Sequence, residues 1–363
     1  MSDNHNQLCE LINDQRLRII SILGTRRSGS TIAAKCLAQI ADIVLDSPFN
    51  TAFKAHNNSQ SPILNIEDNA VYDTFCGLIL SEAVKKKSGK QPLIIVVKGT
   101  SGRMGRALFN KWVQLPSSFL VTFRDPAAQL ISLARARYKR EAKDASKLSK
   151  VSDFFGRPLP ELDRQKYPQF NGSILELNQF YWDSLTKEVR AIFEMNSARN
   201  EGERAVPITF LEATLMRFNP QDAWASVLNE LGFHSDNLGG ILKGNWKANM
   251  LSTGRETSSF KERVSRSDGI QPLSLKERVD IKMLHPSLQG HIQKLTPIYT
   301  TLLRASQNYL PSAYVLQDKC CGTDCFLKEV NPFVAEKVLE VQGVSRLRTD
   351  IRTVLCPEGC GCG

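Results

Sequence analysis

The sequence has 363 residues, of which 42% are hydrophobic and 23% are charged, a composition typical of a globular protein with a sizeable core. No apolar run approaches the roughly 20 residues that span a bilayer, and the polar start of the chain has no secretory signal, so we expect a cytoplasmic protein. The net charge of +10 favours an anionic ligand such as a nucleotide or an acidic acceptor, although a solvated basic surface gives the same value. We expect no nucleic-acid partner, because the sequence has neither a zinc-finger pattern nor a basic face interleaved with aromatic residues.

Five short apolar runs predict buried strands, at residues 18–24, 43–45, 93–97, 119–123 and 206–210. Helices are predicted between and after them, at 32–40, 130–134, 178–195, 223–231 and 275–305. This alternation predicts an α/β fold with a mainly parallel sheet and helices on both faces. The fold is P-loop-like, because its first strand runs into a glycine-bearing loop and then a helix.

The domain organisation follows from shifts in composition. We expect an N-terminal arm at residues 1–17, one α/β domain at 18–310 and a Cys-rich tail at 311–363. The polar stretches 139–172 and 245–271 are predicted to be substrate or lid loops. Basic residues in or beside them are candidates for contacts with an acidic acceptor or with donor phosphate: Arg137, Lys139, Arg140, Arg255, Lys261 and Arg263.

Residues 25–31, which read TRRSGST, form the polar loop between the first strand and its helix. Such a loop cradles an anion, because its backbone N–H groups and the positive end of the helix dipole point at the ligand. The Walker A pattern GxxxxGK(S/T) is incomplete, since Ser30 replaces the lysine that NTP-hydrolysing loops place on the outer phosphates. The nearest cations are Arg26 and Arg27, so the loop has a P-loop outline with a different placement of charge.

This loop resembles the 5′-phosphosulfate-binding loop of sulfotransferases that use 3′-phosphoadenosine-5′-phosphosulfate (PAPS), in which a basic residue precedes a short Ser/Thr-Gly-Ser/Thr run. A second motif of that family is similar to the strand 119–123 with its Arg-Asp-Pro ending and a serine eight residues after the arginine. The resemblance covers residues 18–231 and includes a looser match at 206–212. It implies these donor-binding residues: Arg26, Arg27, Ser28, Gly29, Ser30 and Thr31 for the loop, and Arg124 and Ser132 for the 3′-phosphate.

The resemblance implies transfer of a sulfuryl group from PAPS to a hydroxyl or amine acceptor, with 3′-phosphoadenosine-5′-phosphate (PAP) as the other product. Arg27 and Lys98 would neutralise charge on the transferring group. Thr100 stands where many cytosolic members carry a histidine base, so Asp46, followed by Ser-Pro-Phe, is the expected base. His56 and Glu212 are the alternatives.

Other interpretations stay open. A non-catalytic nucleotide-binding scaffold would keep the fold and present the cysteines, and a P-loop kinase is disfavoured by the missing lysine. In the tail, Cys321, Cys325, Cys356 and Cys360 could bind zinc, remain reduced in a solvated segment, or serve a redox role. The sequence identifies neither the acceptor nor the oligomeric state.

Overall fold

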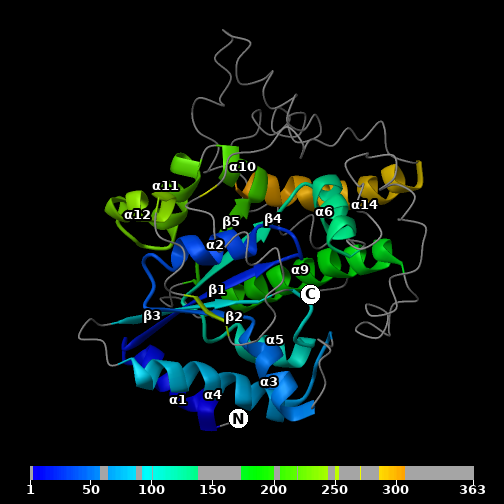
Figure 1. The fold of residues 1–363 in the computed structure, drawn as a ribbon. Helices are drawn as coiled ribbons and strands as arrows, with labels where there is room; N and C mark the ends of the chain where they lie inside the picture. Colours follow the sequence, from blue (N-terminus) through cyan, green and yellow to red (C-terminus); the bar gives the residue numbers. More distant parts are fainter. Residues whose placement is uncertain are drawn as a thin grey trace.

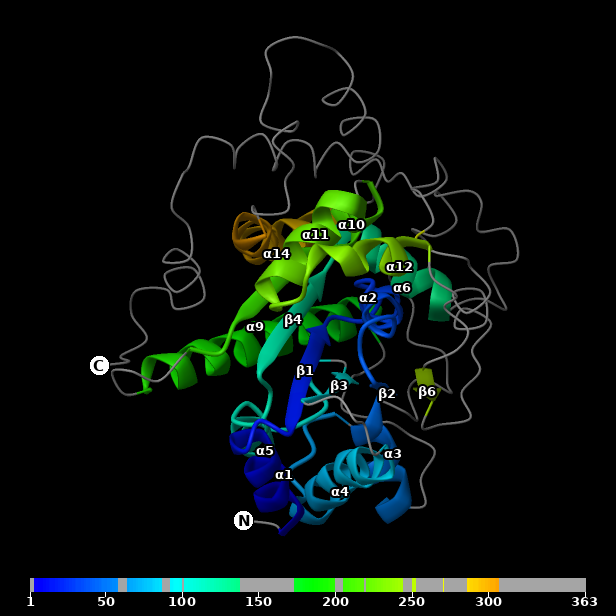
Figure 2. The ribbon, with the colours of Figure 1, turned by 90° about the vertical axis from the view of Figure 1, so that its left-hand side faces the viewer.

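The computed structural model describes residues 3–57, 64–86, 92–99, 101–137, 173–199, 205–218, 220–243, 250–252, 270 and 286–306. The strands of this part form one sheet with the order β5-β4-β1-β3-β2-β6, in which every neighbouring pair is parallel. They are β1 (Leu17–Gly24), β2 (Ile43–Asp46), β3 (Leu93–Lys98), β4 (Ser118–Phe123), β5 (Ile208–Glu212) and the three-residue edge strand β6 (Met250–Ser252). Helices flank the sheet on both sides (Figures 1 and 2), so the predicted α/β fold with a parallel sheet is confirmed.

Burial on both faces explains why the strands are almost continuously apolar in sequence. All six residues of β4 are buried, and β1 is buried at every position except Arg18. The predicted strand at 206–210 begins instead at Ile208, because Pro207 has no N–H to donate to the ladder. The sequence pattern missed β6, which is too short to show a period.

Side chains of β1 alternate between two layers of helices. Ile19 and Leu23 pack in the larger core, and Ile20 and Ile22 pack in the core on the other face. The first layer contains α1 (Asp3–Asn13), α3 (Pro48–Asn57), α4 (Asn69–Lys85), α5 (Arg106–Trp112), α9 (Ile174–Ser197) and α14 (Pro286–Ala305). The second contains α2 (Ser30–Leu37), α10 (Ala213–Phe218), α11 (Pro220–Glu230), the 3-10 turn η1 (Ser235–Asn237) and α12 (Leu238–Lys243). Helix α6 (Pro126–Arg137) packs with α9 and α14 in a third apolar cluster.

The segment expected as an N-terminal arm contributes to this core. Leu8 of α1 is fully buried, and the Nδ1 atom of the buried His5 lies 2.9 Å from the hydroxyl of Tyr72 on α4. The sequence pattern also gave no indication of α3 and α4, which fill the stretch between β2 and β3. Val84 is exposed although it is apolar, so α4 lacks a clean apolar stripe in its sequence.

Several predictions from the sequence lie outside the described residues. They include the loop at 139–172, the tail at 311–363 with its four candidate zinc ligands, and most of 245–271, of which 250–252 form β6. In the part of the chain that the structure describes, no helix is long and apolar enough to cross a membrane.

Candidate functional site

The strand order has a switch point at the end of β1. From β1 the chain passes to β2, returns to β3 beside β1, and then crosses to β4 and β5 on the other side of β1. The loops after β1, β3 and β4 therefore diverge at the carboxyl end of β1, the switch point where open α/β sheets bind their ligands. The β1–α2 loop, residues 25–29, lies at this point.

The β1–α2 loop is tightly constrained at its base. Its residues Arg27 and Gly29 have φ angles of 70° and 86°, in the left-handed region. The Ser28 hydroxyl donates to the Thr25 carbonyl at 2.7 Å and lies 2.9 Å from the Thr122 hydroxyl of β4. A Cβ at Gly24 would lie 2.3 Å from that Thr122 oxygen, so only glycine fits there. Ser28 therefore uses its buried side chain to shape the loop, although the sequence predicted it as a donor-binding residue.

The start of α2 offers backbone donors to an anion. Gly29 is its N-cap and supplies no side-chain acceptor to the first turn. The first N–H groups of a helix have no partner one turn earlier, and the helix dipole makes this end positive. Gly29, Ser30 and Thr31 are half-buried, so the predicted loop residues present these donors at the crevice.

Arginines surround the β1–α2 loop and connect it to α6. The Arg27 Nε atom donates to the Ser132 hydroxyl on α6 at 3.0 Å, which brings together residues from the two sequence motifs. Arg124 follows β4 directly and is half-buried. The Arg26 guanidinium lies 5.9 Å from the centre of the Tyr181 ring on α9, a distance at which cation–π attraction still acts.

A buried amide network supports the loop from below, and sequence reasoning missed it. Gln129 of α6 is fully buried and donates to the Arg26 carbonyl at 2.9 Å. Its side-chain oxygen accepts hydrogen bonds from Trp182 at 2.6 Å and from Asn178 at 3.2 Å. The Asn178 oxygen lies 3.0 Å from the Nε2 atom of His291, so that nitrogen carries the proton. Such a network holds the loop in one arrangement. If any side chain of the network moved, several buried hydrogen bonds would be lost together.

Lys98 and Asp46 form a buried ion pair beside the loop. They are direct partners in the β2–β3 ladder, and the Lys98 Nζ atom donates to Asp46 Oδ1 at 2.7 Å. Their side chains are only 7% and 2% exposed. Val44 and Val96, two residues earlier on each strand, pack in the core that contains α2. Alternation therefore turns Lys98 and Asp46 toward the face on which α2 begins.

The two alternative bases have other environments. His56 is exposed on α3, where its Nε2 atom lies 2.6 Å from the hydroxyl of Thr74. Glu212 is 1% exposed, and its oxygens accept from the backbone N–H groups of Asp125 at 3.1 Å and Thr214 at 2.5 Å. Glu212 therefore anchors the turns after β4 and β5, and neither residue has the geometry of a base at the loop.

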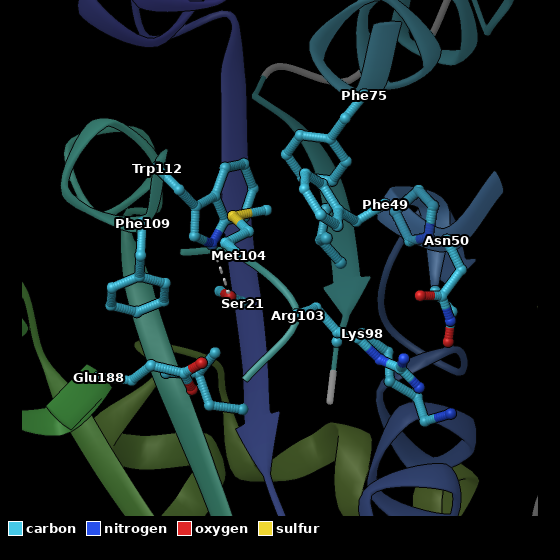
Figure 3. Close-up of a pocket in the computed structure, with 15 residues that line it drawn as sticks. Ser21, Phe49, Asn50, Phe75, Lys98, Arg103, Met104, Phe109, Trp112 and Glu188 are labelled. Atoms are coloured by element: carbon cyan, nitrogen blue, oxygen red, sulfur yellow. Dashed lines mark hydrogen bonds between the residues drawn. The ribbon is translucent and has the colours of Figure 1, made fainter. Parts of the chain in front are cut away.

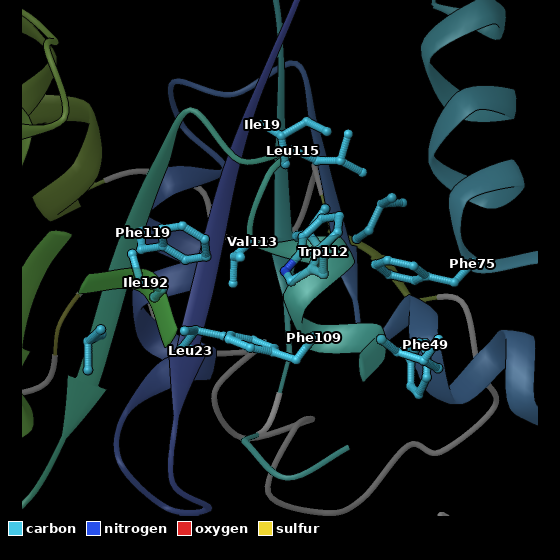
Figure 4. Close-up of a cluster of buried hydrophobic side chains, with 14 of the residues drawn as sticks. Ile19, Leu23, Phe49, Phe75, Phe109, Trp112, Val113, Leu115, Phe119 and Ile192 are labelled. Carbon is cyan, nitrogen blue, oxygen red and sulfur yellow. The ribbon is translucent and has the colours of Figure 1, made fainter. Parts of the chain in front are cut away.

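A pocket lies next to the ion pair, on the face covered by α5 and α9 (Figure 3). We call it the Trp112 pocket, and it is lined by Ser21, Leu23, Ser47, Pro48, Phe49, Asn50, Phe75, Val97, Lys98, Gly99, Arg103, Met104, Phe109, Trp112 and Glu188. Its aromatic side chains also belong to the main core (Figure 4), so this wall is part of a packed scaffold. The sequence predicted Lys98 for the site and missed the rest of this pocket.

Glu188 is a buried carboxyl group of this pocket that the sequence analysis overlooked. It is 7% exposed, and its Oε1 atom accepts from the Gly102 N–H at 2.7 Å. Burial raises its pKa to about 7, against the opposing effects of the Ser101 hydroxyl and the Gly102 N–H. A glutamate on the apolar stripe of α9, between the buried Leu185 and Val189, was the available signal.

Metal binding has no support in the described part of the chain. No group of three or more His, Cys, Asp or Glu residues that could hold a metal ion occurs there. Cys9, Cys36 and Cys76 are free thiols, and the candidate zinc ligands of the tail lie outside the described residues, as does Thr100.

Replacing Gly24 by alanine should disrupt the loop. We expect Gly24→Ala to lose about 2 kcal/mol or more of stability, because the new methyl group meets Thr122 and Ser28 within van der Waals distance. Urea unfolding measures the loss. The control is Gly290→Ala in α14, where a Cβ meets nothing within 4 Å and should stabilise the helix by about 0.5–1 kcal/mol. Equal effects of the two substitutions would contradict the constrained loop.

Replacing Glu188 by glutamine should stabilise the protein at neutral and basic pH. Folding raises the pKa of Glu188 from 4.5 to about 7, so the folded state binds this proton more tightly than the unfolded chain does. Stability is therefore lost as the pH rises from 4.5 to about 7, by about 3 kcal/mol. Glu188→Gln should be more stable than the wild type by this amount at pH 8 and by nearly nothing at pH 4.5, as measured by urea unfolding. Glu194→Gln, on the exposed side of the same helix, should show no such dependence; a pH-independent difference for Glu188→Gln would refute the burial effect.

Comparison with known proteins gives this chain no family. No protein-family model matches the sequence, and no curated protein matches it either. The functional proposal therefore rests on the residues of this chain and on the contacts among them.

Proposed function

We propose that this chain is a sulfotransferase that moves a sulfuryl group from PAPS to a hydroxyl or amine acceptor by in-line displacement. The observation that carries the proposal is the 3.0 Å contact between Arg27 Nε and Ser132 Oγ. It joins the two motifs that resemble the donor site of that family, although they are about 100 residues apart in sequence. The position of the β1–α2 loop at the switch point of the sheet supports a P-loop-like donor site.

The donor would be held at both of its phosphate ends. Backbone N–H groups of residues 29–31 would bind the 5′-phosphate at the start of α2. Arg124 and Ser132 would bind the 3′-phosphate, since a guanidinium offers a planar fork of donors to phosphate oxygens. The Ser132 oxygen already accepts from Arg27, and its own hydrogen can point to a phosphate. Ser132 would therefore contact both the 3′-phosphate and Arg27 of the loop that binds the 5′-phosphate.

Lys98 and Arg27 would stabilise the charge that develops during transfer. Lys98 holds its ammonium against Asp46, and it would approach the oxygen that bridges phosphorus and sulfur. The ion pair fixes the direction of this ammonium before the substrate binds, which preorganises the site. Asp46 would serve as the base through its position beside Lys98 and Ser47, whose hydroxyl donates to Asp46 Oδ1 at 3.0 Å.

Two other functions are less well supported. A P-loop kinase would need a lysine where Ser30 stands, and no basic side chain occupies that position. A non-catalytic nucleotide-binding scaffold would have no need of a buried Lys98–Asp46 pair at the sulfuryl end, because such a pair costs desolvation energy. The metal-binding role of the cysteine tail stays a hypothesis.

The donor site should select for the 3′-phosphate. Calorimetry should show that PAP binds much more tightly than AMP, ADP or ATP. Arg124→Ala should weaken the binding free energy of PAP by roughly 2–4 kcal/mol, the range for a charge-assisted pair. The exposed Arg106 at the start of α5 provides the control, since Arg106→Ala should leave the affinity unchanged. Equal affinity for AMP and PAP would rule out this donor.

Replacing Asp46 by asparagine should separate binding from turnover. We expect PAP affinity to stay nearly unchanged and transfer of ³⁵S from PAPS to fall by at least about a hundredfold, the lower range for a lost acid–base group. The exposed Asp14 provides the matched control, since Asp14→Asn should change neither the affinity nor the turnover. Full turnover in a folded Asp46→Asn protein would remove Asp46 from the mechanism.

A further inference from the structure

Gln129 lies behind the β1–α2 loop and binds its backbone. The side chain is fully buried, and its Nε2 atom donates to the Arg26 carbonyl at 2.9 Å. Chemistry fixes which way round this amide lies, because the Trp182 indole is a donor only and lies 2.6 Å from the other end of the amide. That end is therefore the oxygen, and the NH₂ group must face the Arg26 carbonyl.

The rest of the buried network keeps the Gln129 amide from turning over. Its oxygen accepts from Trp182 and also from the Nδ2 atom of Asn178 at 3.2 Å. If the amide turned over, its NH₂ group would meet these two donors, and the hydrogen bond to the Arg26 carbonyl would be lost as well. Gln129 therefore offers a donor of fixed direction to the loop.

The hydrogen bond from Gln129 sets the direction of one peptide group of the loop. A trans peptide is planar, and its C=O and N–H groups point in opposite directions. Because the Arg26 carbonyl points to Gln129 on α6, the N–H of Arg27 points to the opposite side of the loop. The next N–H group, that of Ser28, is directed from within the loop, since it donates to the Thr25 carbonyl at 3.3 Å.

Arg27 is held in a backbone conformation that side chains disfavour. Its φ of 70° is positive, as is that of Gly29, whereas Ser28 between them has no positive φ. Turning over the peptide between Arg26 and Arg27 would change φ at Arg27 and could relieve this strain. Strained residues persist where surrounding contacts enforce them, and they gather at ligand-binding sites. Alternation of left-handed and ordinary residues is also the backbone pattern of anion-binding concavities.

Helix α6 holds the loop at two points. Gln129 and Ser132 are three residues apart, so they lie on the same face of this helix. Ser132 accepts from the Arg27 side chain, whereas Gln129 binds the backbone one residue earlier. The contact of Ser132 with a side chain leaves the direction of the peptide to Gln129. The two residues therefore have separate roles in the loop.

We propose that Gln129 is a positioning residue of the donor site, which turns the Arg27 N–H toward the 5′-phosphate beside the N–H groups of residues 29–31. The inference rests on the proposed function. Gln129 touches neither the nucleotide nor the sulfur, and it acts through the Arg26 carbonyl. Without this hydrogen bond the peptide can turn over and present its carbonyl oxygen, the negative end of the peptide dipole, to the phosphate.

The first test compares a ligand that has a 5′-phosphate with one that lacks it. Calorimetry on the full chain measures the affinity for PAP and for adenosine 3′-phosphate. Gln129→Met keeps a similar volume and removes the donor. It should weaken PAP about tenfold or more, the scale of one hydrogen bond to a charged group, and change adenosine 3′-phosphate by less than about twofold. Gln114→Met, at an exposed glutamine, should change neither affinity.

The second test uses pH to restore the donor. Gln129→Glu keeps the shape and the accepting oxygen, but its carboxylate cannot donate to the Arg26 carbonyl at pH 8. PAP should then bind about tenfold or more weakly than to the wild type. At pH 5 burial favours the protonated carboxyl group, whose O–H can donate, so the deficit should shrink to about threefold or less. The deficit of Gln129→Met should not change with pH, and the exposed Gln114→Glu should show none.

Other groups also titrate near this amide, so each variant is compared with the wild type at the same pH. PAP changes its own phosphate charge near pH 6. The charged and titratable residues around the network are Arg26 and Arg27 in the loop, Arg124 and Asp125 before α6, Asp183 on α9, and His291 and Lys294 on α14. Their contributions are common to the wild type and the variant, and they cancel in the ratio of the two affinities.

The outcomes separate this inference from the proposed function. If the wild type does not bind PAP, the proposed function fails and the inference fails with it. If Gln129→Met binds PAP like the wild type, or weakens both nucleotides equally, Gln129 does not position the 5′ end and the donor site stands. A folded Gln129→Glu protein with the same deficit at both pH values would contradict donation to Arg26. Urea unfolding checks the fold of each variant, and Gln129→Met decides the case if the glutamate variant does not fold.

Discussion

The close approach of β1 and β4 at Gly24 and Thr122 is the constraint on which the site depends. Gly24 has no side chain that could collide with Thr122, so the chain can turn out of the sheet directly after it. The Ser28 hydroxyl then closes this turn against Thr122. The left-handed Arg27 and Gly29 then direct α2 away from the crevice. The same turn places Arg27 against Ser132, so one steric condition positions the β1–α2 loop and joins it to α6.

Buried polar groups gather at the carboxyl edge of the sheet, and each has a cost that the core must offset. Gln129 and Glu212 offset it through hydrogen bonds to backbone and side-chain partners. Lys98 and Asp46 recover part of it in their ion pair. Glu188 recovers least, since burial raises its pKa to about 7.

The sequence was informative where a single residue type or the spacing of apolar residues determines the local structure. Apolar runs located β1 to β5, and the glycine-bearing loop was located between β1 and α2, because both signals are local. The pattern could not show that Ser28 turns into the loop or that Asp46 pairs with Lys98, since these contacts depend on strand order and register. Gln129 and Glu188 were missed for the same reason: each acts through partners far away in sequence. Helices α1 and α4 were missed because tertiary packing compensates for weak patterns.

A crystal structure of the chain with PAP tests the central claim most directly. The account predicts the 5′-phosphate within hydrogen-bond distance of the backbone N–H groups of residues 29–31, at the start of α2. It also predicts the 3′-phosphate on Arg124 and Ser132, with Lys98 facing the 5′-phosphate oxygen that would carry the sulfuryl group. PAP bound elsewhere, or bound at the loop with its 3′-phosphate in solvent and away from Arg124 and Ser132, would contradict it.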